Sequence, residues 1–465
     1  MQFQFVGPSY QARSLNLDAQ RSVNLYLEAD QTGKNPIALF GTPGTRKVLT
    51  LPTYPVRGLI NAGGTLYAVG GNHVYTIDTD YNATSIGTIG TSSGQVSLAY
   101  NGTQVMLVDG SAGYICTTTV TQITSGGFIA TPKQVAFQDG YFIVIGSGQH
   151  FNISALYDGL TWDAADFASA ESNPDGLVGC IVDHRELWLM GEQTCEVWYN
   201  SGNADFPFER IAGAILEVGC ASAYSVAKLD NSIFWLGSDD RGRGTVWRAA
   251  GYQPQRLSTH AIETAIAGYA DLSQAIAYTY QQEGHAFYVL TFPEATWVYD
   301  VATQTWHERA YRDTSTGELG RHRSNCFASF NGEALVGDYQ DGRIYALDLD
   351  YYTDDGDPLP AIRACAHISN DLNKIFFHRL HVDTEMGVSG SGEDAQISMR
   401  YSNDGGHTWS SEKWASLGKI GETRRRAQWR RLGSARDRVF EVTITDPVKR
   451  VLLGATLDVE VGDRG

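Results

Sequence analysis

The chain has 465 residues, of which 42% are hydrophobic and 11% aromatic, with 50 glycines, 24 tyrosines and only 13 prolines. This composition supplies enough apolar material for a large core, so it excludes a disordered chain, a collagen and a short disulfide scaffold. The 35 Lys and Arg residues against 52 Asp and Glu residues leave a formal net charge of -17, which disfavours tight sequence-independent binding of a nucleic-acid backbone.

Signals for export are not evident in the sequence. The first residues lack the basic and long apolar regions of a signal peptide, and no stretch approaches about eighteen consecutive apolar residues. We therefore expect a soluble, unexported protein without a membrane anchor. The six cysteines contain no C-x-x-C pair, so we expect them to be reduced and mostly buried.

The first part of the chain, residues 1–35, precedes a repeated region and is predicted to form an N-terminal arm. In residues 36–350 a short unit recurs: a polar turn, a strand of alternating apolar residues, a tight turn rich in Gly or Asp, and a second strand. Residues 64–78 and 101–116 are two examples. The units begin about 40 to 50 residues apart, which is the period of a four-stranded propeller blade.

These repeats predict a β-propeller of six or seven blades over residues 36–350. A single blade cannot bury both faces of its sheet, whereas a ring of blades covers every face and leaves only short edges exposed. Propellers usually close by pairing an early strand with a late one, and residues 36–51 are the predicted donor of that closing strand.

The end of the chain has a different pattern. Residues 351–361 are dense in acidic, Gly and Pro residues and are interpreted as a linker. After them, residues 362–465 contain further alternating strands, and about 100 residues of this kind favour a β-sandwich-like domain. The predicted fold class is therefore all-β, with a β-propeller followed by a C-terminal β-sandwich-like domain.

The most specific short motif is an Asp-box hairpin with the pattern S-x-D-x-G-x-T-W in the C-terminal domain. In such a box the Ser and Asp side chains bond to groups of a turn, the Gly supplies a positive φ, and the Trp packs beneath. Asp-boxes are familiar from sialidases, but the box is a turn brace remote from catalysis, so the structural interpretation is favoured. The residues of the box are Ser402, Asp404, Gly406, Thr408 and Trp409.

Two charged clusters lie in or next to the C-terminal domain. The basic one is either an exposed strand face that prevents wrong pairing or a docking surface for an acidic partner or another copy of the chain. Its central residues are Arg424, Arg425, Arg426, Arg430 and Arg431, and it continues through Arg436, Arg438, Lys449 and Arg450. The acidic one is either a solvated loop face or a channel wall that repels DNA phosphates. Its residues are Asp338, Asp341, Asp354, Asp355 and Asp357.

No set of residues predicts a catalytic, cofactor or metal site. The sequence contains no P-loop, no dinucleotide-binding fingerprint, no nucleophile elbow and no H-E-x-x-H motif. His378 and His381 lie three apart in a predicted strand, which places them on opposite faces and disfavours a shared metal. The Gly-rich residues 241–244 follow two aspartates and are interpreted as a solvated turn.

The N-terminal region carries a further pattern in residues 8–10 (PSY), 20–26 (QRSVNLY) and 39–44 (LFGTPG). In order and spacing these segments resemble the opening of the packaged-DNA stabilisation proteins of short-tailed bacteriophages (podoviruses), also called tail accessory factors, tail hubs or nozzles. The repeats and the Asp-box are similar to that family as well, so the resemblance spans most of the chain. Leu27 stands where the family pattern has a proline, which affects only a turn.

The resemblance implies a β-propeller subunit of a homohexameric ring in the virion tail, below the portal and its adaptor ring. Such a ring continues the DNA channel, retains the packaged genome until ejection, and attaches the tail needle or plug and the tailspikes or fibres. Double-stranded DNA passes through it without specific binding, and neither catalytic residues nor cofactors belong to this role. The protein would be made in the host cytoplasm.

Two alternatives remain open. One is a sialidase-like propeller glycosidase that acts on a host surface glycan, which the Asp-box and the many aromatic residues favour. The other is a monomeric propeller that serves as a binding scaffold. Propellers host all three roles, so the fold alone cannot separate them.

Overall fold

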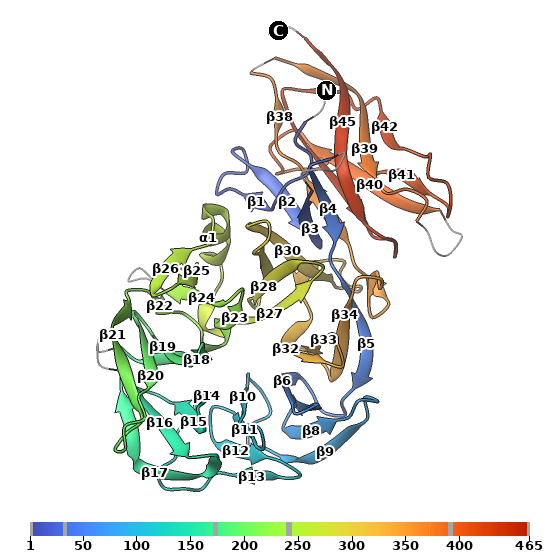
Figure 1. Ribbon diagram of the computed structural model, residues 1–465. Coiled ribbons are helices and arrows are strands. Elements are labelled where there is room, and N and C mark those ends of the chain that lie inside the picture. The colour runs from blue at the N-terminus through green and yellow to red at the C-terminus, as the bar shows by residue number, and fades with distance from the viewer. Residues whose placement is uncertain are drawn as a thin grey trace.

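The computed structural model describes residues 3–30, 35–170, 175–238, 244–371, 373–388 and 394–462. Strands dominate these residues, which contain one α-helix, α1 (His260–Ile266), and two 3-10 turns, η1 (Ala223–Ser225) and η2 (Leu272–Gln274). Figure 1 shows a ring of blades with a smaller layered domain at one side. The predicted all-β class is confirmed. Of the turn predicted at residues 241–244, all but Gly244 lies outside the described residues.

Seven blades form the ring in the described part of the chain, and in each the chain passes from an inner strand outward (Figure 1). The first four blades contain β6 (Val56–Ala62), β7 (Thr65–Gly70), β8 (His73–Ile77) and β9 (Ala83–Thr88); β10 (Ser97–Tyr100), β11 (Val105–Val108), β12 (Gly113–Cys116) and β13 (Val120–Gln122); β14 (Gln134–Gln138), β15 (Tyr141–Ile145), β16 (His150–Ala155) and β17 (Asp158–Ser169); and β18 (Leu177–Asp183), β19 (Glu186–Gly191), β20 (Cys195–Asn200) and β21 (Phe208–Leu216).

The last three blades complete the circle. They contain β22 (Gly219–Cys220), β23 (Ala227–Leu229), β24 (Ser232–Ser238), β25 (Thr245–Ala250) and β26 (Gln253–Arg256); β27 (Ile276–Gln282), β28 (His285–Thr291), β29 (Thr296–Asp300) and β30 (Thr305–Arg312), with β31 (Leu319–Arg321) at its edge; and β32 (Ser324–Phe330), β33 (Glu333–Asp338) and β34 (Arg343–Asp348), which β5 (Gly44–Thr50) joins.

The sequence forms these blades for two local reasons. The second strands, such as β11 and β24, are buried almost throughout, because neighbouring blades cover both faces of each sheet. Most blades join their first two strands by a two-residue turn with both residues at positive φ, as at Asp139 and Gly140 (49° and 94°). That conformation suits Asn, Asp and Gly and matches the right-handed twist of the strands, which explains the repeating turn signal.

The ring closes as the sequence predicts. The closing strand β5 lies within residues 36–51 and pairs antiparallel with β34, with Thr45 opposite Leu347 and Gly44 opposite Asp348. Gly44 must lack a side chain, because a Cβ there would lie 2.0 Å from the carbonyl oxygen of Tyr351. An N-terminal strand therefore completes the blade that the chain builds last.

The C-terminal domain is a sandwich of two sheets. One sheet contains β3 (Leu25–Ala29), β4 (Ile37–Gly41), β45 (Val451–Val461), β39 (Ile375–Thr384), β42 (Ala427–Arg430) and β43 (Ser434–Ala435), and the other contains β37 (Ala361–Ala364), β44 (Asp437–Ile444), β40 (Ala395–Ser402), β41 (Lys413–Gly418) and β38 (Ile368–Ser369). Apolar side chains from both sheets, such as Leu380 and Phe440, fill the space between them.

The predicted arm and linker are not separate from the two domains. Strand β2 (Ala19–Val23), with β1 (Tyr10–Gln11) at its edge, lies between β30 of the propeller and β37 of the sandwich, while β3 and β4 belong to the sandwich. Residues 351–361 contain the hairpin of β35 (Thr353–Asp354) and β36 (Asp357–Pro358), which extends the sheet of the seventh blade beside β5. The pairings of β2 with β30 and β37, of β4 with β45 and of β35 with β5 join strands hundreds of residues apart, so no local pattern reveals them.

Candidate functional site

The N-terminal segment 20–26 fastens the propeller to the sandwich. Arg21 on β2 binds the carboxylate of Glu308 on β30 through two atoms, Nε to Oε1 at 2.9 Å and Nη2 to Oε2 at 2.7 Å. The Asn24 amide donates to the carbonyl oxygens of Ala310 and Pro360, each at 2.9 Å. It so joins β30, the fourth strand of the sixth blade, to the segment that enters the sandwich. The resemblance identified this segment, and the structure places it at the domain junction.

A buried arginine strengthens the same junction. Arg363 on β37 donates from Nη2 to Oε1 of Gln20 at 2.6 Å and from Nη1 to Oγ of Ser22 at 2.9 Å. Its Nε donates to the carbonyl oxygen of Phe5 at 2.7 Å. Burial lowers the pKa of Arg363 to about 10. The guanidinium therefore ties the first described residues to both β2 and the sandwich.

The Asp-box residues form a local brace between β40 and β41. The backbone N–H of Gly406, at a φ of 99°, donates to Oγ of Ser402 at 2.8 Å. The carboxylate of Asp404 accepts from the backbone and hydroxyl of Thr408 at 2.9 and 2.6 Å, and Ser402 and Thr408 together lower its pKa. Half-buried Trp409 packs against a small apolar cluster of β2, β37 and β44. Because the carboxylate bonds to its own turn, this geometry suits a structural role.

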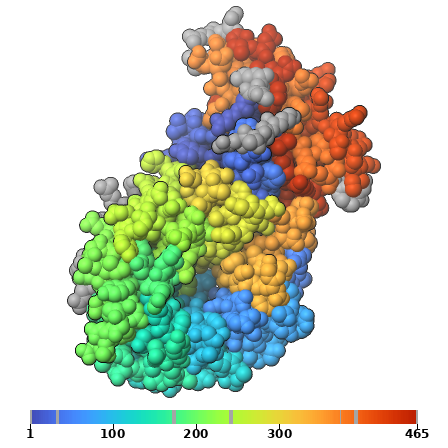
Figure 2. Space-filling model, in the orientation of Figure 1, coloured from blue at the N-terminus to red at the C-terminus, as the bar shows by residue number. Residues whose placement is uncertain are grey.

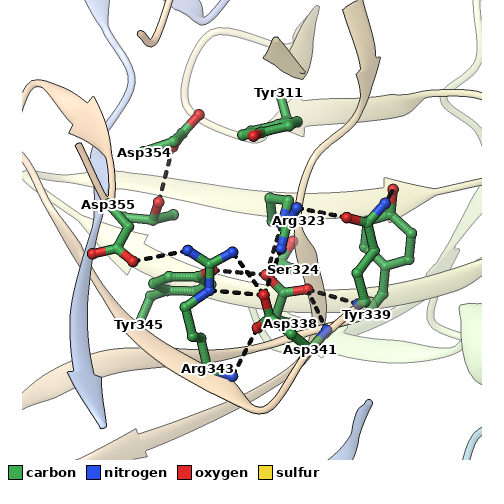
Figure 3. A network of polar contacts seen from close by, with 12 residues as sticks. Tyr311, Arg323, Ser324, Asp338, Tyr339, Asp341, Arg343, Tyr345, Asp354 and Asp355 are labelled. Carbon is green, nitrogen blue, oxygen red and sulfur yellow. Dashed lines mark hydrogen bonds and ion pairs between the residues drawn. The ribbon is translucent and has the colours of Figure 1, made fainter. Parts of the chain in front are cut away.

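The predicted acidic surface is instead a neutralised network beside the ring closure (Figure 3). Asp338 is fully buried, and its Oδ2 accepts hydrogen bonds from Arg323 Nε and from the Tyr345 hydroxyl, both at 2.7 Å. Burial lowers the pKa of Arg323, but Asp338, together with Tyr345 and Asp341, raises it and the net shift is upward. The residue before β32 and the last residue of β33 thus bring opposite charges together.

The rest of this network reaches the closing strand. Arg343 binds Asp341 at 2.6 Å and Asp355 at 2.9 Å, and Lys47 on β5 lies 3.8 Å from Asp355. The dashed contacts in Figure 3 run from Asp341 through Arg343 to Asp355. Partial burial raises the pKa of Asp341, but hydrogen bonds from Arg343 lower it below its ordinary value. These carboxylates brace the closure and do not form a solvated channel wall.

Asp354 and Asp357 are also engaged. Asp354 is 3% exposed and accepts a hydrogen bond from the Thr45 hydroxyl at 2.9 Å, while Asp357 accepts one from the Tyr311 hydroxyl at 2.7 Å. Burial raises the pKa of Asp354 to about 7. Asp338 and Asp354 are therefore buried, and Asp341, Asp355 and Asp357 are half-buried and bonded to neighbouring side chains, so the cluster is not the freely solvated acidic face that the sequence predicts.

The predicted basic surface is exposed. Its members, hereafter the basic surface, are Arg424, Arg425, Arg426, Arg430 and Arg431. Arg430 on β42 lies directly opposite Arg379 on β39, so two like charges face each other across the sheet. Beside them a groove of about 320 Å³ is lined by Arg379, His381 and Arg426. Asp458 also lines this groove and lies 3.6 Å from Arg379, and Arg425 pairs with Glu422 at 2.8 Å. The arginines outnumber these carboxylates, so the face carries an excess of positive charge that suits an acidic partner.

Two arginines of the same basic stretch are buried instead. Arg438 is 1% exposed and its guanidinium lies between the rings of Phe377 (4.2 Å) and Tyr401 (4.1 Å). Arg450 is 2% exposed. Both lie next to or within strands whose inward faces meet the core, so they do not contribute to the basic surface.

The centre of the propeller ring carries no motif that sequence reasoning could detect. Figure 2 shows a hollow at the ring centre, where two cavities of about 340 and 670 Å³ share Thr279 and Phe327 in their walls. Arg57 lines the smaller one and donates to backbone carbonyl oxygens, including those of Gly71 and Thr91 at 2.9 and 2.7 Å. The lining residues come from six of the seven blades and are scattered along the chain, so no local signal exists.

The remaining candidate residues for metal binding or catalysis do not lie together in the described structure. His378 lies 3.5 Å from Glu460, whereas His381 lines the groove of the basic face. Within the described ranges no group of three or more His, Cys, Asp and Glu side chains could hold a metal ion, and the six cysteines are unpaired. No helix in the described part of the chain has the length and apolar character needed to cross a membrane.

A seven-bladed propeller, closed by an N-terminal strand and joined through β2 to a sandwich, defines a two-domain all-β scaffold. Two family models describe these parts: residues 1–352 match the β-propeller of bacteriophage P22 Gp10, and residues 362–460 match its β-sandwich. The chain therefore belongs to the bacteriophage P22 Gp10 family of phage tail and DNA-stabilisation proteins, which confirms the resemblance. Membership supports a structural role in the virion tail.

Solved structures match part of the chain at low identity. The WD40 β-propeller domain of Doa1 is 12% identical and covers 65% of this chain and 96% of its own, with a TM-score of 0.41. Virginiamycin B lyase from Staphylococcus aureus is 10% identical and covers 64% and 97%, with a TM-score of 0.44. Similarities with TM-scores this low support no conclusion about function. No curated protein matches the chain.

Proposed function

We propose that this protein is a ring-forming component of a short-tailed phage tail, in which six copies continue the DNA channel below the portal and its adaptor. The ring retains the packaged genome until ejection and carries attachment surfaces for the tail needle or plug and for tailspikes or fibres. The observation that carries this proposal is the match of both domains, in the same order, to the Gp10 family.

Charge and domain geometry support the proposal. A net charge of -17 disfavours retention of DNA by its phosphates, as a conduit requires. A head-to-tail ring needs two different complementary patches on each copy. The basic surface is one such patch, and the acidic remainder of a neighbouring copy complements it. The Asp-box gives the glycosidase alternative no support, because its carboxylate bonds within its own turn.

Electron microscopy of the chain mixed with an adaptor–portal complex from a short-tailed phage tests the proposed role. Light scattering of the free chain is the control for assembly without the template. We expect a six-fold ring docked beneath the adaptor. A persistent monomer that ignores the complex would reject the tail-ring function and would make a glycan-turnover screen the next experiment.

The docking role of the basic surface has its own test. Reversing Arg424, Arg425 and Arg426 to Glu should weaken assembly several-fold, because it removes the attraction to an acidic neighbour. The matched control reverses the exposed residues Arg13, Arg185 and Lys228 to Glu, which changes the net charge equally and should leave assembly unchanged. Equal behaviour of the two variants would reject this surface as the docking site, whatever the outcome for the ring.

A further inference from the structure

Strand β3 contributes to the cores of both domains through alternating residues. Leu25 packs in the core of the sandwich, whereas Tyr26 packs among side chains of the sixth and seventh blades, such as Phe287 and Tyr345. Glu28 lies two residues after Tyr26, so its side chain leaves the strand on the face that meets the propeller. Figure 1 shows β3 beside β30 at this junction. A strand of the sandwich sheet thus brings a carboxylate to a propeller blade.

His285, the first residue of β28, joins this carboxylate to the propeller. Its side chain is 5% exposed, and its two ring nitrogens bond to different side chains. Nδ1 lies 2.8 Å from Oδ2 of Asp300 on β29, and Nε2 lies 2.8 Å from Oε2 of Glu28 on β3. The ring also stacks on Phe287, with 5.6 Å between the ring centroids and 6° between the planes. One imidazole therefore connects the two domains.

These two bonds require a proton on both ring nitrogens. A carboxylate only accepts hydrogen bonds, whereas a neutral imidazole has one N–H donor and its other nitrogen is an acceptor. Asp300 already acts as an acceptor for the backbone N–H of Ala302 at 3.0 Å and for the Thr303 hydroxyl at 2.7 Å. The geometry is therefore satisfied only by the imidazolium form of His285.

The surroundings explain why this ring carries the proton. The hydrogen bond to Asp300 raises the pKa of His285, burial lowers it, and the bond to Glu28 raises it again, so that it lies at about 9. His307 on β30 is the opposite case: neither of its nitrogens has a hydrogen-bond partner among the described residues, and burial lowers its pKa. The titratable and charged side chains around this site are Glu28 and Tyr26 of β3, Glu283 in the turn before β28, Asp300 of β29, and His307 and Arg309 of β30.

Loss of one proton from His285 affects its two bonds differently. The Asp300 side chain is fully buried and cannot exchange the ring for water, whereas the Glu28 side chain is 37% exposed. The remaining proton therefore stays on Nδ1, and the lone pair of Nε2 faces the Glu28 carboxylate. Because water can solvate that carboxylate, the contact that opens is the one between the domains.

We propose that His285 is a proton-dependent latch between the two domains. The imidazolium holds Glu28 of the sandwich sheet against the propeller, and the neutral ring releases it, with the proton passing to solvent on the Glu28 side. The latch does not depend on the ring assembly proposed above, because all of its groups belong to one copy of the chain.

Urea unfolding from about pH 6 to pH 9 tests the charge of the latch. The folded pKa of His285 is about 9, above its ordinary value of 6.5, so its stabilisation is fully present below about pH 6.5 and is lost as the pH rises to about 9. Over this window the advantage of the wild type over His285→Gln in the folding equilibrium constant should fall by up to about tenfold per pH unit. A difference that stays constant over this range would overturn the proposal.

The matched control is His150→Gln, at an exposed histidine that bonds to the Ser169 hydroxyl. It has no carboxylate partner in the described contacts, so its difference from the wild type should show no loss between pH 6.5 and 9. The same loss in this variant would assign the effect to histidine titration in general and would overturn the latch.

Hydrogen–deuterium exchange tests the release of β3 itself. After correction for the intrinsic pH dependence of exchange, residues 25–29 should exchange several-fold faster at pH 9 than at pH 7, whereas residues 105–108 of β11 should not change. Glu28→Gln removes the charge that the latch holds, so its residues 25–29 should lose this pH dependence. Protection of β3 in the wild type that is equal at both pH values would overturn the proposal.

Nitrogen-15 NMR of the histidine-labelled wild type decides if His285→Gln fails to fold. At pH 7.5 we expect a histidine ring with protons on both nitrogens whose signal shifts in Glu28→Gln. The pH at which this ring titrates should fall by about 1 in that variant, because a nearby negative charge is removed. A wild-type spectrum without such a ring would overturn the proposal.

Discussion

The ring closure and the outer face of the sandwich both carry many charged side chains, which are mostly paired at the closure and mostly exposed on the sandwich. Around the closure, Asp338 and Asp341 meet Arg323 and Arg343, and the charges are paired and largely enclosed. On the sandwich, Arg430 faces Arg379 across two strands, and the positive charge stays on the surface. Enclosed ion pairs brace a fold, whereas exposed arginines in excess of their carboxylate partners remain available to a partner protein.

Among the changes that test this comparison, removal of the Asp338 carboxylate should have the largest effect on the free energy of unfolding. Asp338→Ala leaves Nε of Arg323 and the Tyr345 hydroxyl without their acceptor in a buried place, although Arg323 keeps its bonds to Gln340 and Asp341. We expect a loss of about 3–5 kcal/mol in the free energy of unfolding. Urea unfolding measures it. Asp350→Ala, at an exposed carboxylate, is the control and should change stability by less than about 0.5 kcal/mol. A loss below about 1 kcal/mol for Asp338→Ala would contradict the bracing role.

The arginines of the sandwich should divide by burial. Arg438→Ala removes a guanidinium that lies between two rings and leaves the carbonyl oxygen of Leu432 unpaired, so we expect a loss of about 2–4 kcal/mol. Arg431→Ala, on the basic surface, should stay within about 0.5 kcal/mol of the wild type in the same unfolding experiment. Similar losses of stability for both variants would show that burial does not decide how much each arginine stabilises the fold.

The buried carboxyl of Asp354 should give the closure a pH dependence. Burial raises its folded pKa to about 7, above its unfolded value near 4, so the folded state binds the proton more tightly. Its contribution is therefore present at low pH and falls by about 1 kcal/mol per pH unit as the pH rises from about 4 to 7. The charged groups that face it are Arg450, Asp357 and Arg323.

The measurement compares the wild type with Asp354→Asn, whose side chain cannot ionise. The difference between their unfolding free energies should change with pH across that window and flatten above about pH 7. A difference that is constant from pH 4 to 7 would show that the carboxyl is already ionised in the folded protein.

The smallest expected effect concerns the like charges of the basic surface. Arg430→Glu replaces a repulsive cross-strand pair by an attractive one with Arg379, so we expect a gain of about 0.2–1 kcal/mol in stability. Thermal or urea unfolding detects it, with Arg424→Glu, which has no such cross-strand partner in the described pairings, as the control. A loss of stability would show that Arg430 and Arg379 do not repel each other in the folded protein.

Much of the propeller could be predicted because its signals are local. Apolar runs such as that of β24 and turns such as Asp139 and Gly140 repeat along the chain, and together they specify strands, hairpins and their spacing. The places of β2 and β3 could not be predicted in this way. Strand β2 pairs with β30 and β37, and the hairpin of β3 and β4 joins its sheet through the pairing of β4 with β45. These partners are separated by most of the chain, so only long-range pairing decides the sheet.

The same limit applies to the charged residues. The density of aspartates at Asp338 and Asp341 is visible in the sequence, but their neutralisation depends on Arg323 and Arg343, which reach them through strand pairing and turns. The N-terminal segment was identified through its resemblance, yet the pairing of Arg21 with Glu308 has no local signal. Sequence reasoning therefore found where charge is concentrated and missed which charges meet.

The closing strand β5 has a consequence for how the chain folds during synthesis. It leaves the ribosome before every other strand of the propeller, but its partners are far away: Arg46 and Asp348 are separated by 302 positions, and Thr45 and Asp354 by 309. Until β34 appears, β5 presents unpaired backbone groups next to an open arc of blades. The strand that completes one ring is thus also the strand through which two half-made copies would exchange parts.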